Sequence, residues 1–374
     1  MLDEISRAVL SRDEIARYLA GADGEDARAA RERIEAYLEE LRTTQRYSMY
    51  RALKHPVYLL LRTVERIGEH VEVAKAATRA ARVVYAANHR SHLDYLVAPL
   101  VLDDNGVRPP IIAAGINMFG GPLGLLNRHV TGALPIRRNS RDPLYLMTLK
   151  AYVAELLRKH DLFLFPEGGR SYSGEMKPPK TGLLHAALQA EHPRVQIVPT
   201  AVSYDLVLED YVLSRQKVKR AQRPFSRELA EMVRYSVGYR SRAFVTFGPP
   251  ISVDGVDATS RRAVLDLGHT IMQAIGRVYK VLPTAVVACA MRPSITRREL
   301  EERASAIVDT LGSAGANLAV ATGAEAVDAA MEPLESRGIL VSEAGRIRVR
   351  DRNALRYYAR SLDHLLASPS RHTH

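Results

Sequence analysis

Residues 82–95 read RVVYAANHRSHLDY, a short apolar run followed at once by a cluster of polar and ionisable side chains. An apolar run of this length is typical of a buried strand, and a helical pattern follows the cluster. Similar apolar runs, several of them separated by helical patterns, occur at 111–114, 133–136, 162–165, 195–202 and 243–247. This alternation predicts an α/β fold whose sheet is largely buried and covered by helices.

The two ends of the chain have a different pattern. Residues 1–75 predict an N-terminal helical region, in which breakers are few and charges are typical of solvated helix faces. Residues 76–285 contain the predicted strands and form the predicted central domain. Residues 286–374 predict a mostly helical C-terminal region, with a small hairpin at 338–350. The chain should therefore be an α/β protein with helical extensions at both ends.

Composition limits the kind of partner. Lys and Arg number 53 against 42 Asp and Glu, and the formal net charge of +11 favours an anionic partner such as a bilayer, a phosphorylated substrate or nucleic acid. The single cysteine, Cys289, excludes an internal disulfide framework and a cysteine zinc site. We expect no signal peptide, and no apolar run reaches the roughly 18 residues of a membrane span. A lipid-active protein of this kind should lie on the bilayer.

Two compatible interpretations account for the polar cluster after the first strand. Ser91 and Asp94 fit a helix capping box, which explains both without any chemistry. Asp94 could also hold one imidazole nitrogen of His89 while the other nitrogen faces a substrate. Histidine suits general-base catalysis because its pKa lies near neutrality, and a carboxylate fixes its tautomer. A metal site of His89, His92 and Asp94, or a nucleophilic triad of Ser91, His92 and Asp94, is a weaker alternative.

Two further segments offer cations or backbone amides. Arg137 and Arg138 end a predicted strand, where a guanidinium could bind phosphate, although a solvated charge run is the plainer interpretation. Residues 165–170 read FPEGGR, and their two glycines could expose backbone amides to an anion. Lys177 and Lys180 follow just before a helix and add two cations.

A fourth segment, residues 195–202, is apolar but contains Pro199. A proline within such a run indicates an edge strand or a bulge.

Taken together and in this order, the four segments resemble the glycerolipid acyltransferase superfamily. That family carries a His-x-x-x-x-Asp block, a Gly-x-x-x-x-x-Arg block, a Phe-Pro-Glu-Gly block and an apolar block with proline. HRSHLDY at 89–95 and EGGRS at 167–171 look like the bacterial glycerol-3-phosphate 1-O-acyltransferase branch, as do AAGIN at 113–117 and LRYYAR at 355–360. Asn88 also fits the pattern of 2-acyltransferases that use lysophosphatidate. The chain is much shorter than typical bacterial members of the first branch.

The resemblance implies a role for each matching residue. His89 would be the general base and Asp94 its orienting partner. The blocks that bind the acceptor or shape its site contribute Arg137, Arg138, Glu167, Gly168, Gly169 and Pro199. We add Arg90 and Arg170 as expected phosphate contacts. No metal and no cofactor is expected, because acyl-CoA or acyl-carrier protein supplies the acyl group as a co-substrate.

The resemblance therefore predicts that residues 76–285 catalyse acyl transfer to the sn-1 hydroxyl of glycerol 3-phosphate, which makes lysophosphatidate for phospholipid synthesis. Dihydroxyacetone phosphate or lysophosphatidate as acceptor, or an inactive lipid-binding scaffold, stays open as an alternative. We expect peripheral binding at the cytoplasmic face of the cell membrane and no nucleic-acid partner.

Two basic segments are candidates for contact with an anionic membrane. One is the stretch 47–71, which could be an amphipathic helix or simply pack on the next domain. The other is the group Arg215, Lys217, Lys219, Arg220 and Arg223, which could equally dock an acyl-carrier protein or belong to a solvated helix.

Overall fold

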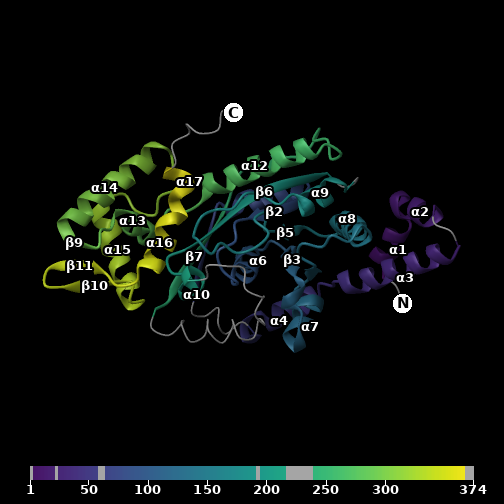
Figure 1. Cartoon of the computed structure of the whole chain (residues 1–374), viewed down its shortest axis with the longest axis horizontal. Helices are drawn as coiled ribbons and strands as arrows, with labels where there is room; N and C mark the ends of the chain where they lie inside the picture. The colour runs from purple at the N-terminus through teal and green to yellow at the C-terminus, as the bar shows by residue number, and fades with distance from the viewer. Residues whose placement is uncertain (1–2, 22–23, 58–63, 191–193, 216–238, 367–374) are drawn as a thin grey trace.

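A computed structural model describes residues 3–21, 24–57, 64–190, 194–215 and 239–366. In this part of the chain, eight strands form one sheet at the centre of an elongated molecule (Figure 1). The strand order is β1 (Val64–Glu69), β7 (Ser241–Phe247), β6 (Val195–Tyr204), β2 (Arg82–Ala87), β5 (Leu162–Leu164), β3 (Ile111–Gly115) and β4 (Ala133–Ile136), with β8 (Ile251–Ser252) beside β6. The strand predictions are therefore confirmed to within a few residues.

The sheet is mostly parallel and buried on both faces. Strands β6, β2, β5, β3 and β4 run parallel, whereas β7 and β8 pair antiparallel with β6. In Figure 1, α12 (Arg261–Val278) and α9 (Gly182–Leu188) lie above the sheet and α6 (Asp94–Asp104) lies below it. Because both faces are covered, β2 is apolar along its whole length after Arg82. The α/β class with a helix-covered sheet is confirmed.

The first three N-terminal helices, α1 (Glu4–Leu10), α2 (Asp13–Ala20) and α3 (Gly24–Leu41), lie at one end of the molecule (Figure 1). The fourth, α4 (Tyr47–Val57), lies beside α7 (Gly121–His129), nearer the middle. Helices α1 and α3 pack against α8 (Pro143–Leu157). The prediction of helix throughout residues 1–75 is wrong at 64–69, because these residues form β1 and pair with β7 along their whole length. The candidate membrane helix at 47–71 therefore ends with α4 at Val57, and 58–63 lie outside the described residues.

The C-terminal region lies at the opposite end (Figure 1). Its helices are α13 (Pro283–Ala290), α14 (Arg297–Ser313), α15 (Gly323–Ser336), α16 (Arg352–Ala359) and α17 (Asp363–Leu366). The predicted hairpin is confirmed as β10 (Leu340–Glu343) and β11 (Arg346–Val349), to which β9 (Ser294–Thr296) adds a third antiparallel strand. The final predicted helix is interrupted by the 3-10 turn η3 (Arg360–Leu362).

Pro199 lies in an interior strand and not on an edge, and the second predicted alternative, a bulge, fits because three residues, 248–250, lie opposite the two residues 198–199. It pairs with Ala86 of β2 on one side of β6. On the other side, β7 ends opposite Thr200 and β8 begins opposite Ile197. Pro199 therefore faces the gap between two partner strands, where the N–H group that proline lacks is not needed.

Among the described helices, none combines the length and the apolar character that crossing a bilayer requires.

Candidate active site

Four loops meet at the edge of the sheet where β2, β5, β3 and β4 end. Parallel strands bring their C-terminal ends to one edge, which is where sites in open α/β sheets form. His89 follows β2, Glu167 follows β5 and Arg138 follows β4. The parallel topology therefore brings together segments that lie far apart in the sequence.

A histidine–carboxylate pair lies at the centre of this edge. The Nδ1 atom of His89 is 2.9 Å from Oδ2 of Asp94, the first residue of α6. An ionised carboxylate only accepts hydrogen bonds, so Nδ1 carries the proton of the neutral imidazole and Nε2 remains as its proton acceptor. Both side chains are buried, at 8% and 0% exposure. The predicted pairing of His89 with Asp94 is thus present in the structure.

Asp94 is held by hydrogen bonds on both oxygens. Oδ2 also accepts from the backbone N–H groups of Arg90 and Ser91, at 2.6 and 3.0 Å. Oδ1 accepts from the hydroxyl of Tyr204 at 2.7 Å. Burial raises the pKa of Asp94 to about 7, and the hydrogen bonds from Ser91, Tyr204 and Arg90 oppose this rise. The site therefore contains a carboxylate whose charge depends on pH near neutrality.

His89 is uncharged over the same pH range. Its ring stacks on Phe165 at a centroid distance of 4.0 Å. Burial lowers the pKa of His89 well below its usual value, and the positive charges of Arg170, Arg138 and Lys177 lower it further. A neutral imidazole is the form that a general base requires.

The cations that act on His89 come from two loops and converge near Gly169. A methyl group added to Gly169 would lie 3.8 Å from Nζ of Lys177 and 4.0 Å from Nη1 of Arg138. A methyl group on Gly115 would lie 2.9 Å from Nε of Arg138, so this glycine leaves room for the arginine side chain. Positive charge concentrated next to a neutral imidazole suits an anionic substrate.

Arg137 and Arg138 point to different partners. Arg137 makes a two-pronged ion pair with Glu40 of α3, at 2.7 and 2.5 Å, and its guanidinium lies over the rings of Tyr37 and Tyr145. These contacts tie Arg137 to the N-terminal helices. The Gly-x-x-x-x-x-Arg spacing, counted from Gly132, also ends on Arg138. Of the two arginines predicted at the acceptor site, Arg138 lies at the cation cluster and Arg137 does not.

Glu167 joins two loops through hydrogen bonds to both of its carboxylate oxygens. Its Oε1 accepts from the backbone N–H of His89 at 2.9 Å, and its Oε2 accepts from the backbone N–H of Lys177 at 3.1 Å. The side chain is 3% exposed. Gly168, with a φ of +67°, closes the turn by donating to the carbonyl of Phe165 at 2.9 Å. The predicted substrate contact of Glu167 becomes a positioning role.

Arg90 points to the C-terminal region and not to the cation cluster. Its guanidinium lies over the ring of Tyr279 at 5.2 Å, and its Nη2 approaches the carbonyl of Ser361 at 3.5 Å. Arg170 stays at the site, where it lies 3.6 Å from the carboxylate of Glu209. The contacts thus support Arg170, but not Arg90, as a residue at the phosphate side of the site.

The C-terminal helix α16 braces the loops of the site from behind. The hydroxyl of Tyr358 donates to Asp210 at 2.7 Å and accepts from the backbone N–H of Val207 at 2.9 Å. Gly174 has a φ of +90°, and any side chain there would overlap the carbonyl oxygen of Tyr357. These contacts explain why the LRYYAR segment lies next to the active site.

Three positioning residues had not been predicted. Tyr204 binds Asp94, and Glu209 accepts from the hydroxyl of Ser91 at 2.9 Å and from the backbone N–H of His92 at 2.6 Å. Asn88 exchanges two hydrogen bonds with the backbone of Val202 in β6. No spacing rule links these positions to His89. The predicted capping box is formed only in part. The side chain of Asp94 accepts from the backbone N–H of Ser91, whereas the Ser91 hydroxyl donates to Glu209.

The rival interpretations of the cluster find no support in these contacts. The Ser91 hydroxyl points to Glu209 and so does not form a triad with His92. In the described part of the chain, no group of three His, Cys, Asp or Glu side chains could hold a metal ion.

Residues 69–203 match the family model described as Acyltransferase. This segment is an acyltransferase domain. The match covers the His89–Asp94 pair, the Arg138 loop and the Glu167–Arg170 turn. The acyltransferase resemblance is thus confirmed by a comparison that is independent of the geometry.

Relatives of known name cover most of this chain. A protein of Aeromonas hydrophila named glycerol-3-phosphate acyltransferase is 29% identical over 94% of this chain and 48% of its own length. One of the same name from Pasteurella multocida is 30% identical over 80% of this chain and 41% of its own. The chain thus spans about half the length of the curated relatives it matches. The 1-acyl-sn-glycerophosphate acyltransferase of Thermotoga maritima is 16% identical over 56% of this chain and 70% of its own, with a TM-score of 0.32, too low to bear on the argument.

The ionisation of Asp94 predicts the acid side of the pH profile. We expect kcat/KM for acyl transfer to fall as the pH is lowered through about 7, because protonation of Asp94 removes the acceptor for the Nδ1–H of His89. His89 stays neutral there, so its own titration does not produce this fall. Asp94→Asn should lower kcat by roughly 10²–10⁴-fold and abolish the acid limb. An acid limb that persists in Asp94→Asn would show that another group titrates.

Proposed function

We propose that this protein transfers a fatty acyl group from acyl-CoA or acyl-carrier protein to the sn-1 hydroxyl of glycerol 3-phosphate, which makes lysophosphatidate. The observation that carries this proposal is the neutral His89, bound to Asp94, next to the cations Arg138, Arg170 and Lys177. The His89–Asp94 pair can deprotonate a hydroxyl of the acceptor, and the three cations can bind the phosphate of the same molecule. The names of the relatives from Aeromonas and Pasteurella agree with this acceptor.

The reaction follows from this geometry. The acceptor hydroxyl gives its proton to Nε2 of His89 while its oxygen attacks the carbonyl carbon of the thioester. Asp94 stabilises the imidazolium that forms. The C–S bond then breaks, the ester remains on the acceptor, and the proton on His89 passes to the leaving thiolate. General-base assistance of this kind contributes about 10²–10⁴-fold, and alignment of the two reactants by their bound phosphate and acyl groups adds to it.

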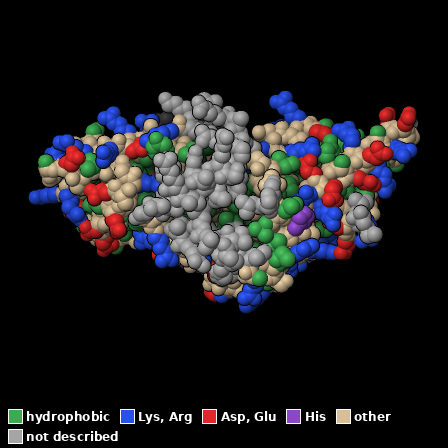
Figure 2. Space-filling model, turned by 90° about the horizontal axis from the view of Figure 1, so that it is seen from below, with side chains coloured by type: hydrophobic (Ala, Val, Ile, Leu, Met, Phe, Trp, Pro, Cys, Tyr) green, Lys and Arg blue, Asp and Glu red, His purple; other side chains and the backbone are tan. Residues whose placement is uncertain are grey.

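We further propose that the protein binds peripherally at the cytoplasmic face of the cell membrane. Ile116 of η2 (Ile116–Met118) and Leu125 of α7 (Gly121–His129) are 40% and 62% exposed. They follow β3, so they lie on the side of the sheet that carries the site. Figure 2 shows hydrophobic side chains gathered beside a histidine on the face that includes α7, whereas charged side chains dominate both ends. Of the basic group at 215–223, Arg215 pairs with Asp351, and the rest lies outside the described residues.

A thiol-release assay with palmitoyl-CoA tests the reaction. We expect release that depends on glycerol 3-phosphate and that His89→Ala removes, because the variant lacks the general base. Dihydroxyacetone phosphate and lysophosphatidate serve as competing acceptors, and circular dichroism shows whether the variant is folded. Undiminished release in folded His89→Ala would contradict the mechanism. If the wild type releases no thiol from either palmitoyl-CoA or palmitoyl-carrier protein, the alternative of an inactive lipid-binding scaffold is favoured.

Arg138 and Arg137 form a matched pair for testing the phosphate contact. We expect Arg138→Gln to raise the KM for glycerol 3-phosphate by about tenfold or more, with a much smaller effect on the KM for the acyl donor. Arg137→Gln removes the same charge but breaks contacts with Glu40, Tyr37 and Tyr145, which lie away from the cation cluster, so it should leave the acceptor KM nearly unchanged. Steady-state kinetics with each substrate varied separately measures both. Equal effects of the two substitutions would exclude the specific role of Arg138.

Leu125 and Leu265 form a matched pair for testing membrane contact. Leu125→Ser should weaken binding to phosphatidylcholine vesicles containing phosphatidylglycerol by about tenfold, because one buried leucine contributes about 1.5–3 kcal/mol. Leu265, which is 40% exposed on α12, provides the control Leu265→Ser. Vesicle flotation measures binding of both variants. If both variants float to the same extent, the surface formed by η2 and α7 is not the membrane contact.

A further inference from the structure

A second cationic cleft opens on the far edge of the sheet. Its volume is about 610 Å³, within the range of sites for small molecules. Its lining comes from the end of α5 (Val71–Ala80), the start of β2, and the loops that lead into β3 and β5. The lining residues are Lys75, Thr78, Arg79, Arg82, Asn105, Gly106, Val107, Arg108, Pro109, Lys159, His160 and Asp161.

The cleft is separate from the active site. Arg82 begins β2 and His89 follows its end, so the strand separates the two by about 20 Å at roughly 3.3 Å per residue. The loops before β3 and β5 enter the cleft, and the loops after the same strands enter the active site. The acyl-transfer chemistry at His89 therefore does not account for the cleft.

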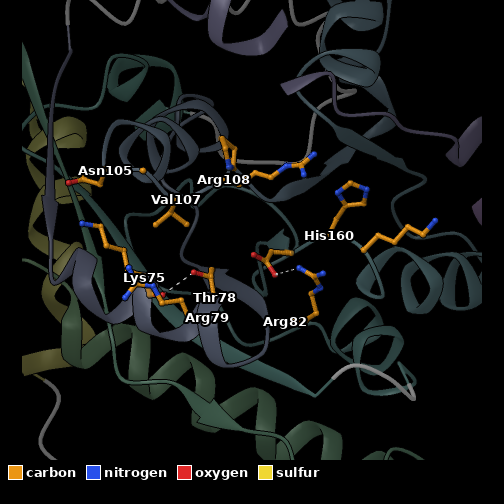
Figure 3. Close-up of a pocket in the computed structure, with 12 residues that line it drawn as sticks. Lys75, Thr78, Arg79, Arg82, Asn105, Val107, Arg108 and His160 are labelled. Atoms are coloured by element: carbon orange, nitrogen blue, oxygen red, sulfur yellow. Dashed lines mark hydrogen bonds and ion pairs between the residues drawn. The ribbon is translucent and has the colours of Figure 1, made fainter. Parts of the chain in front are cut away.

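The lining carries far more positive than negative charge. It contains five Lys or Arg side chains and a single carboxylate, Asp161. Figure 3 shows Arg79 and Arg82 on one side of the cleft, with Arg108 and His160 across from them. So many like charges around one cleft repel one another unless an anion lies between them.

Acidic partners compensate three of the five cations, because Lys75 pairs with Glu72 at 2.8 Å, Lys159 with Glu4 at 2.5 Å and Arg82 with Asp161. Among the described residues, Arg79 and Arg108 form no ion pair with a carboxylate, and Nε of Arg108 donates to the neutral side chain of Gln45 at 2.8 Å. Asp161 lies 3.8 Å from Arg82, but the same carboxylate also accepts from the backbone N–H of Val83 at 3.0 Å. Arg79 and Arg108 are both exposed, so their charges are accessible to a ligand in the cleft.

The pKa of His160 is sensitive to the positive charge around the cleft. Burial, together with the positive charges of Arg108, Arg82 and Lys159, lowers the pKa of His160 to about 4. The imidazole is therefore neutral at pH 7, when it can donate one hydrogen bond and accept another. An anion in the cleft would offset the repulsion and raise this pKa.

We propose that this cleft binds a ligand with one or more phosphate groups, at a site distinct from the acyl-transfer centre. Arg79 and Arg108 supply planar, hydrogen-bonding cations, which match phosphate oxygens, whereas Lys75 and Lys159 at the rim are paired with Glu72 and Glu4. His160 is the only aromatic side chain in the described lining, so the cleft offers no Phe, Tyr or Trp ring on which a nucleobase could stack. The chemistry fits a soluble polyphosphate or the phosphate headgroup of a lipid.

Binding of radiolabelled pyrophosphate by equilibrium dialysis tests the proposal. All proteins carry Arg138→Gln, so that the active-site cations contribute less. We expect Arg79→Gln combined with Arg108→Gln to weaken binding by about tenfold or more, because both substitutions keep the polar shape but remove the charge. Arg262→Gln combined with Arg298→Gln is the matched control, since these arginines are 92% and 90% exposed on other helices. Identical isotherms for the two double variants would overturn the proposal.

A second readout comes from nitrogen NMR of labelled histidine, with His160→Gln for assignment. Pyrophosphate should raise the pKa of His160 from about 4 in the control but not in the cleft variant. Vesicles of phosphatidylcholine with and without phosphatidate distinguish the two sources of phosphate. Loss of phosphatidate-dependent vesicle binding in the cleft variant would identify a lipid headgroup, and loss of pyrophosphate binding alone would identify a soluble ligand. No loss of either would refute the site.

Discussion

The buried carboxylate of Asp94 is the constraint on which the site depends. A charge with no exposure to water is tolerated only when its oxygens are filled with hydrogen bonds. The backbone of the 89–93 loop supplies two donors, His89 a third, and Tyr204 a fourth from the neighbouring strand β6. These hydrogen bonds stabilise the carboxylate charge, and the one from Nδ1 of His89 also fixes the orientation of the imidazole. Loop conformation, histidine tautomer and sheet packing are therefore set by one group.

The parallel strands bring the other loops of the site close to Asp94. Because β2, β5, β3 and β4 end at one edge, short loops from each can reach His89 without long excursions. Glu167 then fastens the loop after β5 to the backbone of His89, and Glu209 fastens the start of α6. Both acids are buried. Glu167 accepts from two backbone N–H groups, whereas Glu209 accepts from the Ser91 hydroxyl and the backbone N–H of His92 and lies 3.6 Å from Arg170. The two buried acids thus fix the loops that carry His89 and the cations.

Much of the fold and the centre of the site could be predicted from sequence. Strands β2 and β4 follow from their apolar runs, and the His89–Asp94 pair follows from spacing within one loop and one helical turn. Strand β1 could not be predicted from an apolar run, because its sequence VERIGE is mostly polar and only Val64 is buried. The spacing from Gly132 favours Arg138, but no local pattern tells that Arg137 turns to Glu40, because that partner is set by the tertiary structure. Tyr204 and Glu209 act across long sequence distances for the same reason.

The bracing of the active-site loops by α16 has a consequence for how the chain divides. Tyr358 holds the segment around Val207 and Asp210, while the carbonyl of Tyr357 presses on Gly174. A fragment that stopped at residue 285 would retain the sheet, His89 and Asp94, yet would expose these loops on the side that the later helices now support. The C-terminal region thus forms one side of the active site, although it lies outside the sheet. The smallest unit able to hold the site in this shape extends through residue 362.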